Sequence, residues 1–210
     1  MRKLIILTAL FITPLITLSQ SVNENKDGFT EVIEVDLTQE EIYGKIKEWV
    51  VINYKSAKDV IQLDSKEKVI IKGNQLINII SSSIPMELRL NHTITFSIRD
   101  NKYKVDYIPS GASYTAYPDV IIPNYVYLDL LNSLSKEEYI SINVKRSKEL
   151  LMSMGWKGQR LEKGMKKTEE EFMKYGYDNY IKNKKSLISK VEATYLSIKN
   201  NVKQSTDDDW

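Results

Sequence analysis

The sequence contains no cysteine and only one histidine, His92, among its 210 residues. The absence of thiols excludes disulfide bonds, and a single histidine without cysteine excludes the usual nitrogen and sulfur zinc sites within one chain. The sequence also lacks a glycine-rich phosphate loop, and no serine lies in a GxSxG context. We therefore predict no metal, no cofactor and no catalytic residue from such motifs.

Apart from its first residues, the chain lacks an apolar run long enough to span a bilayer. Arg2 and Lys3 precede an apolar stretch over residues 4–18, and small polar residues follow it. This layout predicts a secretory signal peptide over residues 1–20, cleaved near residues 19–20, with an uncleaved membrane anchor as the alternative. We therefore expect an exported protein, periplasmic or secreted, that keeps no transmembrane anchor after cleavage.

A large net charge is also missing, because 28 basic and 28 acidic side chains remain once Arg2 and Lys3 are removed. Residues 20–144 carry 13 basic and 18 acidic side chains, whereas residues 145–210 carry 15 and 10. The overall balance argues against a dominant site for a polyanion, so we predict no nucleic-acid partner. We expect the two halves of the chain to complement each other electrostatically.

The first half of the chain shows strand and helix patterns in turn. Residues 21–28 are polar and predict a flexible lead-in, whereas residues 29–37 alternate loosely and predict a strand. Thr38 followed by Glu41 is a capping box, in which each side chain bonds the other residue's backbone N–H. Apolar residues at helical spacing follow, so an amphipathic helix is predicted over residues 39–53.

Two hairpins are predicted next. Residues 56–74 contain two short strands around a charged turn, with Gly73 and Asn74 ending the second, and residues 75–83 are expected to be an edge strand. Residues 87–107 predict a long antiparallel hairpin. The apolar face of its first strand carries Leu88, Leu90, His92, Ile94, Phe96 and Ile98.

A loop and helical insertion is predicted over residues 109–167. Its first part is a loop rich in proline, glycine and tyrosine. Two helical segments follow over residues 124–133 and 136–153, and the second begins at a capping box of Ser135 and Glu138. Glycines at 155, 158 and 164 then predict a linker.

The chain ends with a helical segment over residues 168–203, which we expect to pack on the sheet. A third capping box, Thr168 with Glu171, would open this segment, and residues 204–210 are expected to be a disordered tail. One apolar stripe runs along it through Ile188, Val191, Tyr195, Ile198 and Val202. The whole order predicts an α+β fold, an antiparallel sheet with amphipathic helices packed on one face.

Four short segments stand out in the first hundred residues: EVIEV, EWV, SAKDVIQ and IIKGN. Together with the hairpin over residues 87–107, they resemble a bacterial domain of unknown function with a TBP-like fold, over about residues 29–108. The resemblance implies a TBP-like strand-helix-sheet core there, and export from a Gram-negative bacterium, which is typical of its members. Its motifs are structural, and a fold name by itself implies no DNA binding. In family members only a short segment usually connects the hairpin to the final helix. The resemblance therefore implies nothing about the insertion.

His92 and the tyrosines are the candidate functional residues. His92 is either a general base or pH switch, or a buried histidine bonded to the backbone or to a tyrosine, and we favour the second interpretation. Tyr103 and Tyr107 alternate with Val105 and are expected in the core. Aromatic side chains with a polar tip are favoured in binding surfaces. The candidate contacts with a ligand or partner are therefore Tyr114, Tyr117, Tyr125 and Tyr127.

Three functions remain open at this point. The leading hypothesis is a non-enzymatic binding or interaction module of the cell envelope, in which the tyrosine-rich loop and the inserted helices contact an unknown protein. The alternative is a carrier that holds an apolar, lipid-like molecule between the sheet and the C-terminal helix. The remote alternative is a hydrolase that uses His92.

Overall fold

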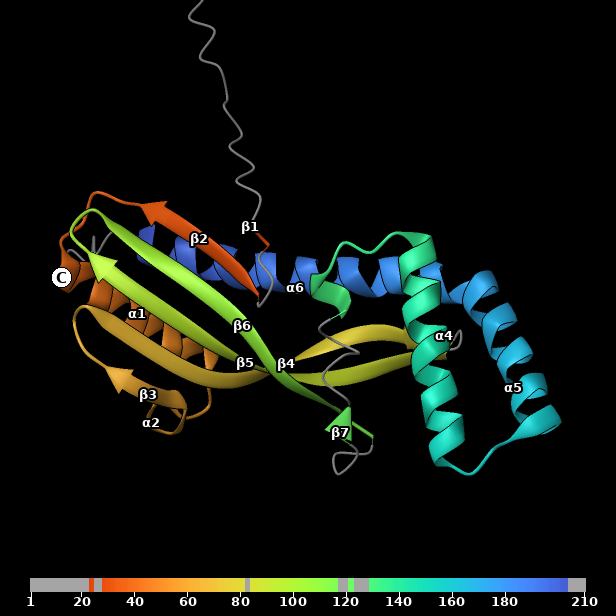
Figure 1. Cartoon of the computed structure of the whole chain (residues 1–210). Helices are drawn as coiled ribbons and strands as arrows, with labels where there is room; N and C mark the ends of the chain where they lie inside the picture. The colour runs from red at the N-terminus through yellow and green to blue at the C-terminus, as the bar shows by residue number, and fades with distance from the viewer. Residues whose placement is uncertain (1–22, 25–27, 82–83, 117–120, 123–128, 204–210) are drawn as a thin grey trace, which may run out of the picture.

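The computed structural model describes residues 23–24, 28–81, 84–116, 121–122 and 129–203 (Figure 1). The predicted signal peptide and the predicted C-terminal tail lie outside these residues, so both remain predictions.

The described strands form one antiparallel sheet with the order β1-β2-β6-β5-β4-β3, and β7 pairs with β6. The strands are β1 (Asn23–Glu24), β2 (Phe29–Glu34), β3 (Ile61–Asp64), β4 (Lys68–Ser81), β5 (Ile84–Arg99), β6 (Lys102–Tyr114) and β7 (Ile121–Ile122). The prediction of a flexible lead-in is wrong for residues 23–24, because they pair with the backbone of β2 at the sheet edge.

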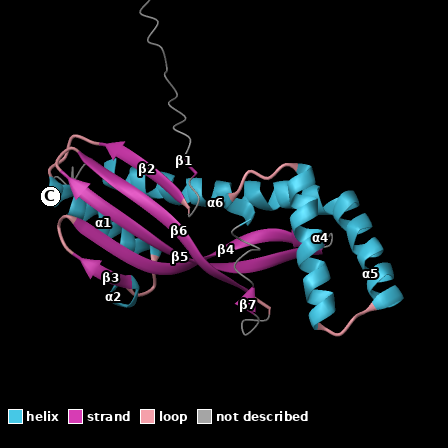
Figure 2. Cartoon of the chain, viewed as in Figure 1, coloured by secondary structure: helices cyan, strands magenta, loops and turns pink. Residues whose placement is uncertain are grey.

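The helices α1 and α6 lie together on one face of this sheet (Figure 2). The helices are α1 (Gln39–Asn53), α2 (Ala57–Val60), α4 (Lys136–Ser153), α5 (Gly158–Glu171) and α6 (Tyr177–Lys203), with a 3-10 turn η1 (Asp129–Leu131) and a π-helical turn η2 (Phe172–Gly176). The predicted α+β architecture, with helices on one face of an antiparallel sheet, is confirmed. Within the described ranges, no helix combines the length and apolar character needed to cross a membrane.

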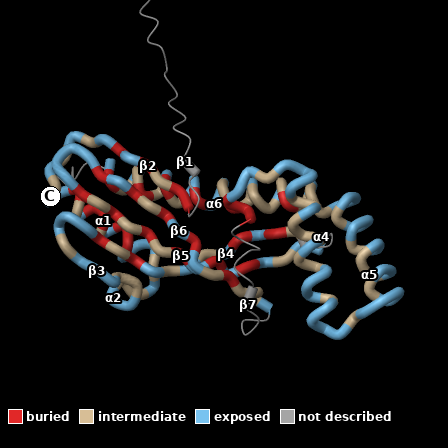
Figure 3. Tube along the Cα trace, viewed as in Figure 1, coloured by how far each residue is buried: buried red, intermediate tan, exposed pale blue. Residues whose placement is uncertain are grey.

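The core lies between the sheet and the two helices (Figure 3). On β5, the six residues predicted for the apolar face are all buried, and the residues between them are not. From α6 the core receives Tyr180, Leu187, Val191, Tyr195, Ile198 and Val202. Four of the five predicted stripe residues are therefore buried, whereas Ile188 is only half-buried because Leu187 takes the inner position.

Two of the three predicted capping boxes are present. Thr38 precedes α1, where its backbone N–H donates to Glu41 Oε2 at 2.8 Å, and Ser135 precedes α4 in the same way. Hydrogen bonds from Thr38 hold the pKa of the Glu41 carboxyl below its ordinary value. The third box is wrong, because Thr168 lies inside α5 and the chain is already helical ten residues before it.

The predicted end of a strand at Gly73 and Asn74 is wrong. β4 continues to Ser81 and pairs with β5 along its whole length, so the expected edge strand over residues 75–83 is a continuation of β4. Gly73 does not break the strand; it makes room for the ring of Tyr54, since a Cβ there would lie 2.4 Å from the Tyr54 Cε1 atom. The first strand of the hairpin is β3, and Ala57–Val60 before it are helical.

The predicted loop from residue 109 begins later than expected, because β6 extends to Tyr114. The register between β5 and β6 shifts between Asn91 and His92, which pair with Gly111 and Pro109. Ser110 is thus an extra residue on β6, a bulge that lets the strand continue past a proline. The bulge lies directly opposite His92.

The predicted linker at the glycines around residue 158 is also wrong. Only the turn between α4 and α5 is irregular, and α5 begins at Gly158 and continues through η2 into α6. Gly155 and Gly158 have positive φ angles of 82° and 53°, which suits the turn. Gly164 instead lies under the Trp156 ring, since a Cβ there would be 2.8 Å from Trp156 Cζ3.

Within the described residues 129–171, the contacts with the core lie at the base of the two inserted helices. Leu130 and Leu131 of η1 are buried, and the Asp129 carboxylate accepts hydrogen bonds from both terminal nitrogens of Arg146 on α4. Tyr139 packs against Tyr180, with ring centroids 4.9 Å apart. α4 and α5 are described in full and contain no buried residue, so their distal ends project as an arm (Figure 1).

Candidate functional site

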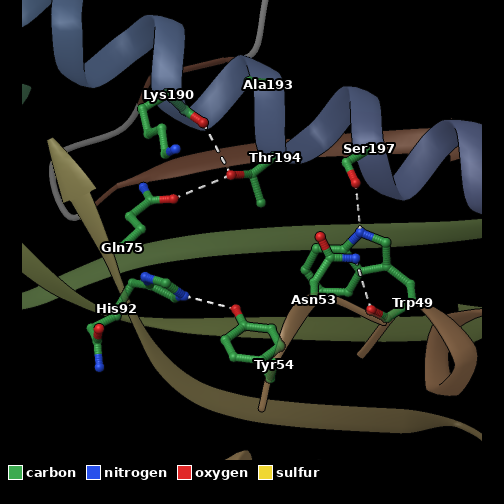
Figure 4. A pocket seen from close by; sticks show the side chains of 10 residues that line it. Trp49, Asn53, Tyr54, Gln75, His92, Lys190, Ala193, Thr194 and Ser197 are labelled. Carbon is green, nitrogen blue, oxygen red and sulfur yellow. Dashed lines mark hydrogen bonds between the residues drawn. The ribbon is translucent and has the colours of Figure 1, made fainter. Parts of the chain in front are cut away.

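A partly open pocket of about 260 Å³ lies between the sheet and α6, where α1 ends (Figure 4). Four elements meet there: the last turn of α1, the strands β4 and β5 where they pair around His92, and the middle of α6. The lining residues are Trp49, Asn53, Tyr54, Asn74, Gln75, His92, Lys190, Ala193, Thr194 and Ser197. The pocket exists because α1 ends at Asn53 while the strands beneath it continue.

His92 forms the buried wall of this pocket. Its side chain is only 2% exposed, its Nε2 atom lies 2.9 Å from the Tyr54 hydroxyl, and its ring stacks on Tyr107. Burial lowers the pKa of the imidazole to about 4, against a smaller opposing effect of the Leu90 backbone, and burial raises the pKa of Tyr54 to about 12. The burial of His92 and its contact with the Tyr54 hydroxyl agree with the interpretation of a buried histidine bonded to a tyrosine.

Gly73 determines whether Tyr54 can reach His92. The two residues Gly73 and His92 are directly paired across β4 and β5, and a Cβ on Gly73 would lie 3.2 Å from His92 Nε2 as well as 2.4 Å from the Tyr54 ring. The Tyr54 ring occupies the space that a side chain on residue 73 would fill, and from there its hydroxyl reaches His92.

We expect Gly73→Ala to lower the free energy of unfolding by about 1–3 kcal/mol, because the Tyr54 ring must leave His92. Gly44→Ala is the matched control, since nothing lies within 4 Å of a Cβ at that position of α1. Alanine should stabilise α1 there by about 0.5–1 kcal/mol. Urea denaturation of both variants measures the two effects, and a neutral Gly73→Ala would contradict the described position of Tyr54.

The wall formed by α6 is polar. The Thr194 hydroxyl lies 3.3 Å from Gln75 Oε1 and 3.0 Å from the Lys190 carbonyl, so its one proton serves one acceptor at a time (Figure 4). The Trp49 indole N–H donates to Ser197 Oγ at 3.0 Å, which leaves the serine proton available for another acceptor. The exposed Lys190 ammonium adds one positive charge at the rim.

This set of groups is suited to binding rather than to proton transfer. Among the described residues that line the pocket, none is a carboxylate or a second histidine, and His92 is neutral and shielded. A hydrolase needs a base within reach of a nucleophile in an accessible site. The described residues also include no group of three or more histidine, cysteine, aspartate or glutamate side chains that could hold a metal ion.

Of the predicted tyrosine contacts, Tyr114 alone lies within the described residues, and it is not among the residues that line this pocket. Tyr114 is half-buried at the end of β6, where it pairs with Leu88 and packs against the core. Tyr117, Tyr125 and Tyr127 lie outside the described residues. Tyr54 was not among the predicted site residues. The signal that points to it is Gly73, a glycine in the middle of a strand that leaves room for an aromatic ring.

The sheet order and the α1 position now allow a comparison with known proteins. Residues 29–107 match the family described as a domain of unknown function (DUF4468) with TBP-like fold. This DUF4468 segment runs from β2 into β6 and includes α1, which confirms the resemblance found in the sequence. It contains His92 and Tyr54, whereas the α6 wall of the pocket lies outside the matched range.

Two solved structures are similar to the chain. A DUF4468 family protein from Bacteroides ovatus is 11% identical, with a TM-score of 0.52 over 90% of this chain and 94% of that chain. A TBP-like protein from Parabacteroides distasonis is also 11% identical, with a TM-score of 0.45 over 88% and 98% of the two chains. At this identity the first similarity shows the fold alone. No curated protein sequence matches the chain significantly.

Proposed function

We propose that this protein is an exported, non-enzymatic binding module that takes up a small polar molecule in the pocket between α6 and the sheet. The observation that carries the proposal is the convergence of neutral donors and acceptors from four elements around one cavity. Export is proposed from the layout of residues 1–20, and a periplasmic or secreted location follows from it.

The size and polarity of the pocket limit the ligand. Its volume of about 260 Å³ is below the roughly 300–1,000 Å³ of pockets for drug-sized molecules, so the ligand is small. Hydroxyl groups of Thr194 and Ser197 together with the Lys190 ammonium favour a molecule that carries hydroxyl or carboxylate groups. Trp49 and Ala193 add a limited apolar contact.

A lipid-like cargo is less compatible with this pocket. The space between α6 and the sheet is filled by Leu187, Val191 and Tyr195, each at most 1% exposed. Polar groups line the pocket that remains, and an apolar chain would leave them without partners. The structure offers no comparable observation in favour of a hydrolase.

Native mass spectrometry of the protein purified from the envelope of its own host tests the proposal. We expect a reproducible extra mass of a small polar molecule on the wild-type chain. Ala193→Trp, at an exposed position that lines the pocket, should abolish this mass because the indole fills the cavity. The same spectra show whether residues 1–20 have been removed, as export requires.

Glu192→Trp is the matched control, because Glu192 is the exposed neighbour on α6 that does not line the pocket. This variant should keep the extra mass. A wild-type chain that is bare in repeated preparations would contradict ligand uptake, and an Ala193→Trp chain that still carries the mass would place the ligand elsewhere. An intact N-terminus on protein recovered from the cytoplasm would contradict export.

A further inference from the structure

The arm formed by α4 and α5 ends far from the sheet and from the pocket. Its base is fixed by η1 and by the Asp129–Arg146 ion pair, whereas the turn between the two helices lies at the free end (Figure 1). Figure 3 shows mostly exposed residues around that turn. A surface at this end can contact a partner without disturbing the core.

The free end carries three exposed apolar side chains. Leu150, Met152 and Met154 are 58%, 54% and 64% exposed. Leu150 lies in the last turn of α4, Met154 is the C-cap residue four positions later, and Met152 lies on another side of the helix than Leu150. The packing between α4 and α5 uses other residues, since Leu151 and Trp156 both lie against Gly164. The three apolar side chains are thus available for an external contact.

Basic side chains predominate in this turn and in the parts of α4 and α5 next to it. Residues 147–167 contain six basic and two acidic side chains, although the mature chain as a whole is neutral. The six, all exposed, are Lys148, Lys157, Arg160, Lys163, Lys166 and Lys167. The Arg160 guanidinium lies over the Trp156 ring, 4.1 Å from its centroid, which keeps this charge close to the turn. Residues 136–171 as a whole contain nine basic and seven acidic side chains, so the basic excess belongs to the part of the arm next to the turn.

We propose that the tip of the α4–α5 arm docks on an anionic lipid surface. Its leucine and methionines can enter the headgroup region while the nearby lysines contact lipid phosphates. Neither the three apolar side chains alone nor the six charges alone suffice for stable attachment. Stable peripheral binding combines apolar insertion with electrostatic attraction. Both signals occur here within one turn and its flanks. The proposal rests on none of the residues of the pocket.

Cosedimentation with vesicles tests this docking. One set of vesicles contains equal parts of phosphatidylglycerol and phosphatidylcholine, and the other contains phosphatidylcholine alone. The full chain should bind the anionic vesicles at least about tenfold more strongly, and about 1 M salt should release it because the screening length falls to about 3 Å. The neutral vesicles reveal any binding by the apolar stretch over residues 4–18, which all variants share.

The triple variant Leu150→Gln, Met152→Gln, Met154→Gln should lose about tenfold in affinity for the anionic vesicles. Its matched control is Val51→Gln, Ile52→Gln, Leu196→Gln, which removes three equally exposed apolar side chains from α1 and α6 and should bind as wild type does. Equal binding of wild type to both vesicle types would overturn the proposal, as would a tip variant that binds as wild type does. Absence of vesicle binding together with dimerisation through the tip, or capture of an acidic protein, would also overturn it.

Discussion

Replacing Tyr195 by alanine is expected to lower the free energy of unfolding by about 3–5 kcal/mol, the largest effect of any single substitution considered for this chain. Tyr195 is 1% exposed and lies in the middle of the core stripe of α6. Its hydroxyl lies 3.0 Å from the Phe29 carbonyl and 3.1 Å from the Val105 carbonyl, so one side chain connects α6 with β2 and β6. The variant would leave a cavity at that junction. Urea denaturation of both chains measures the loss.

Two further variants separate the contributions of the ring and of the hydroxyl group. Tyr195→Phe keeps the ring and should cost about 1 kcal/mol, the typical net value of one hydrogen bond. Leu196→Ala changes the next residue, which is 58% exposed, and should change stability by less than about 0.5 kcal/mol. If Tyr195→Ala costs no more than Leu196→Ala, α6 does not pack on the sheet as described.

The second large effect concerns pH. His92 has a pKa of about 4 in the folded chain, below its ordinary value of 6.5, because burial disfavours the imidazolium. Above pH 6.5 the imidazole is neutral in both the folded and unfolded chains, so the shift costs nothing. As the pH falls from 6.5 to about 4, the unfolded chain takes up the proton first and is stabilised. The free energy of unfolding should therefore fall by about 3 kcal/mol across this window.

The effect can be measured directly because the chain has only one histidine. The imidazole proton signals in an NMR spectrum belong to His92 without further assignment. In the folded chain they should stay constant down to about pH 4, whereas in urea they should titrate near 6.5. A folded chain whose histidine titrates near 6.5 would contradict the burial described for this residue.

His92→Gln serves as the control for the stability measurement. Carboxyl groups also titrate in this range, so the relevant quantity is the difference in pH dependence between the wild type and the variant. Glutamine can still bond to Tyr54 and carries no titrating group. The two stability curves should therefore differ by about 3 kcal/mol more at pH 4 than at pH 7.

The parts of the fold that follow from local patterns could be predicted from the sequence. The alternation along β5, the capping boxes before α1 and α4, and the stripe along α6 each follow from neighbouring residues only. Two of the errors occurred at Gly73 and Gly164, which look like breaks in the pattern. Each glycine instead accommodates an aromatic ring, from Tyr54 or Trp156, and a tertiary contact of this kind leaves no periodic signal.

The candidate site was predictable to a smaller extent. The hydrogen bond of His92 with a tyrosine could be anticipated from a polar ring on an apolar strand face. Its partner, Tyr54, lies 38 residues away, and the opposite wall comes from Thr194 and Ser197 on the last helix. Those hydroxyls become part of a site only after α6 has packed. Tyr114 was predicted as a contact because aromatic side chains in loops suggest exposure, but β6 continues through it.

The long separation in sequence between α6 and β2 affects the order in which the protein can fold. Tyr195 contacts the Phe29 carbonyl across 166 residues, and Lys199 pairs with the buried Glu31 across 168. Such distant contacts cannot form on a nascent chain until α6 has left the ribosome, and they slow folding because long loops must close first. During synthesis the apolar face of the sheet therefore lacks the part of its cover that α6 supplies. Until α6 is available the core is incomplete, and the proposed export would have to carry the chain across the membrane in such an unfolded state.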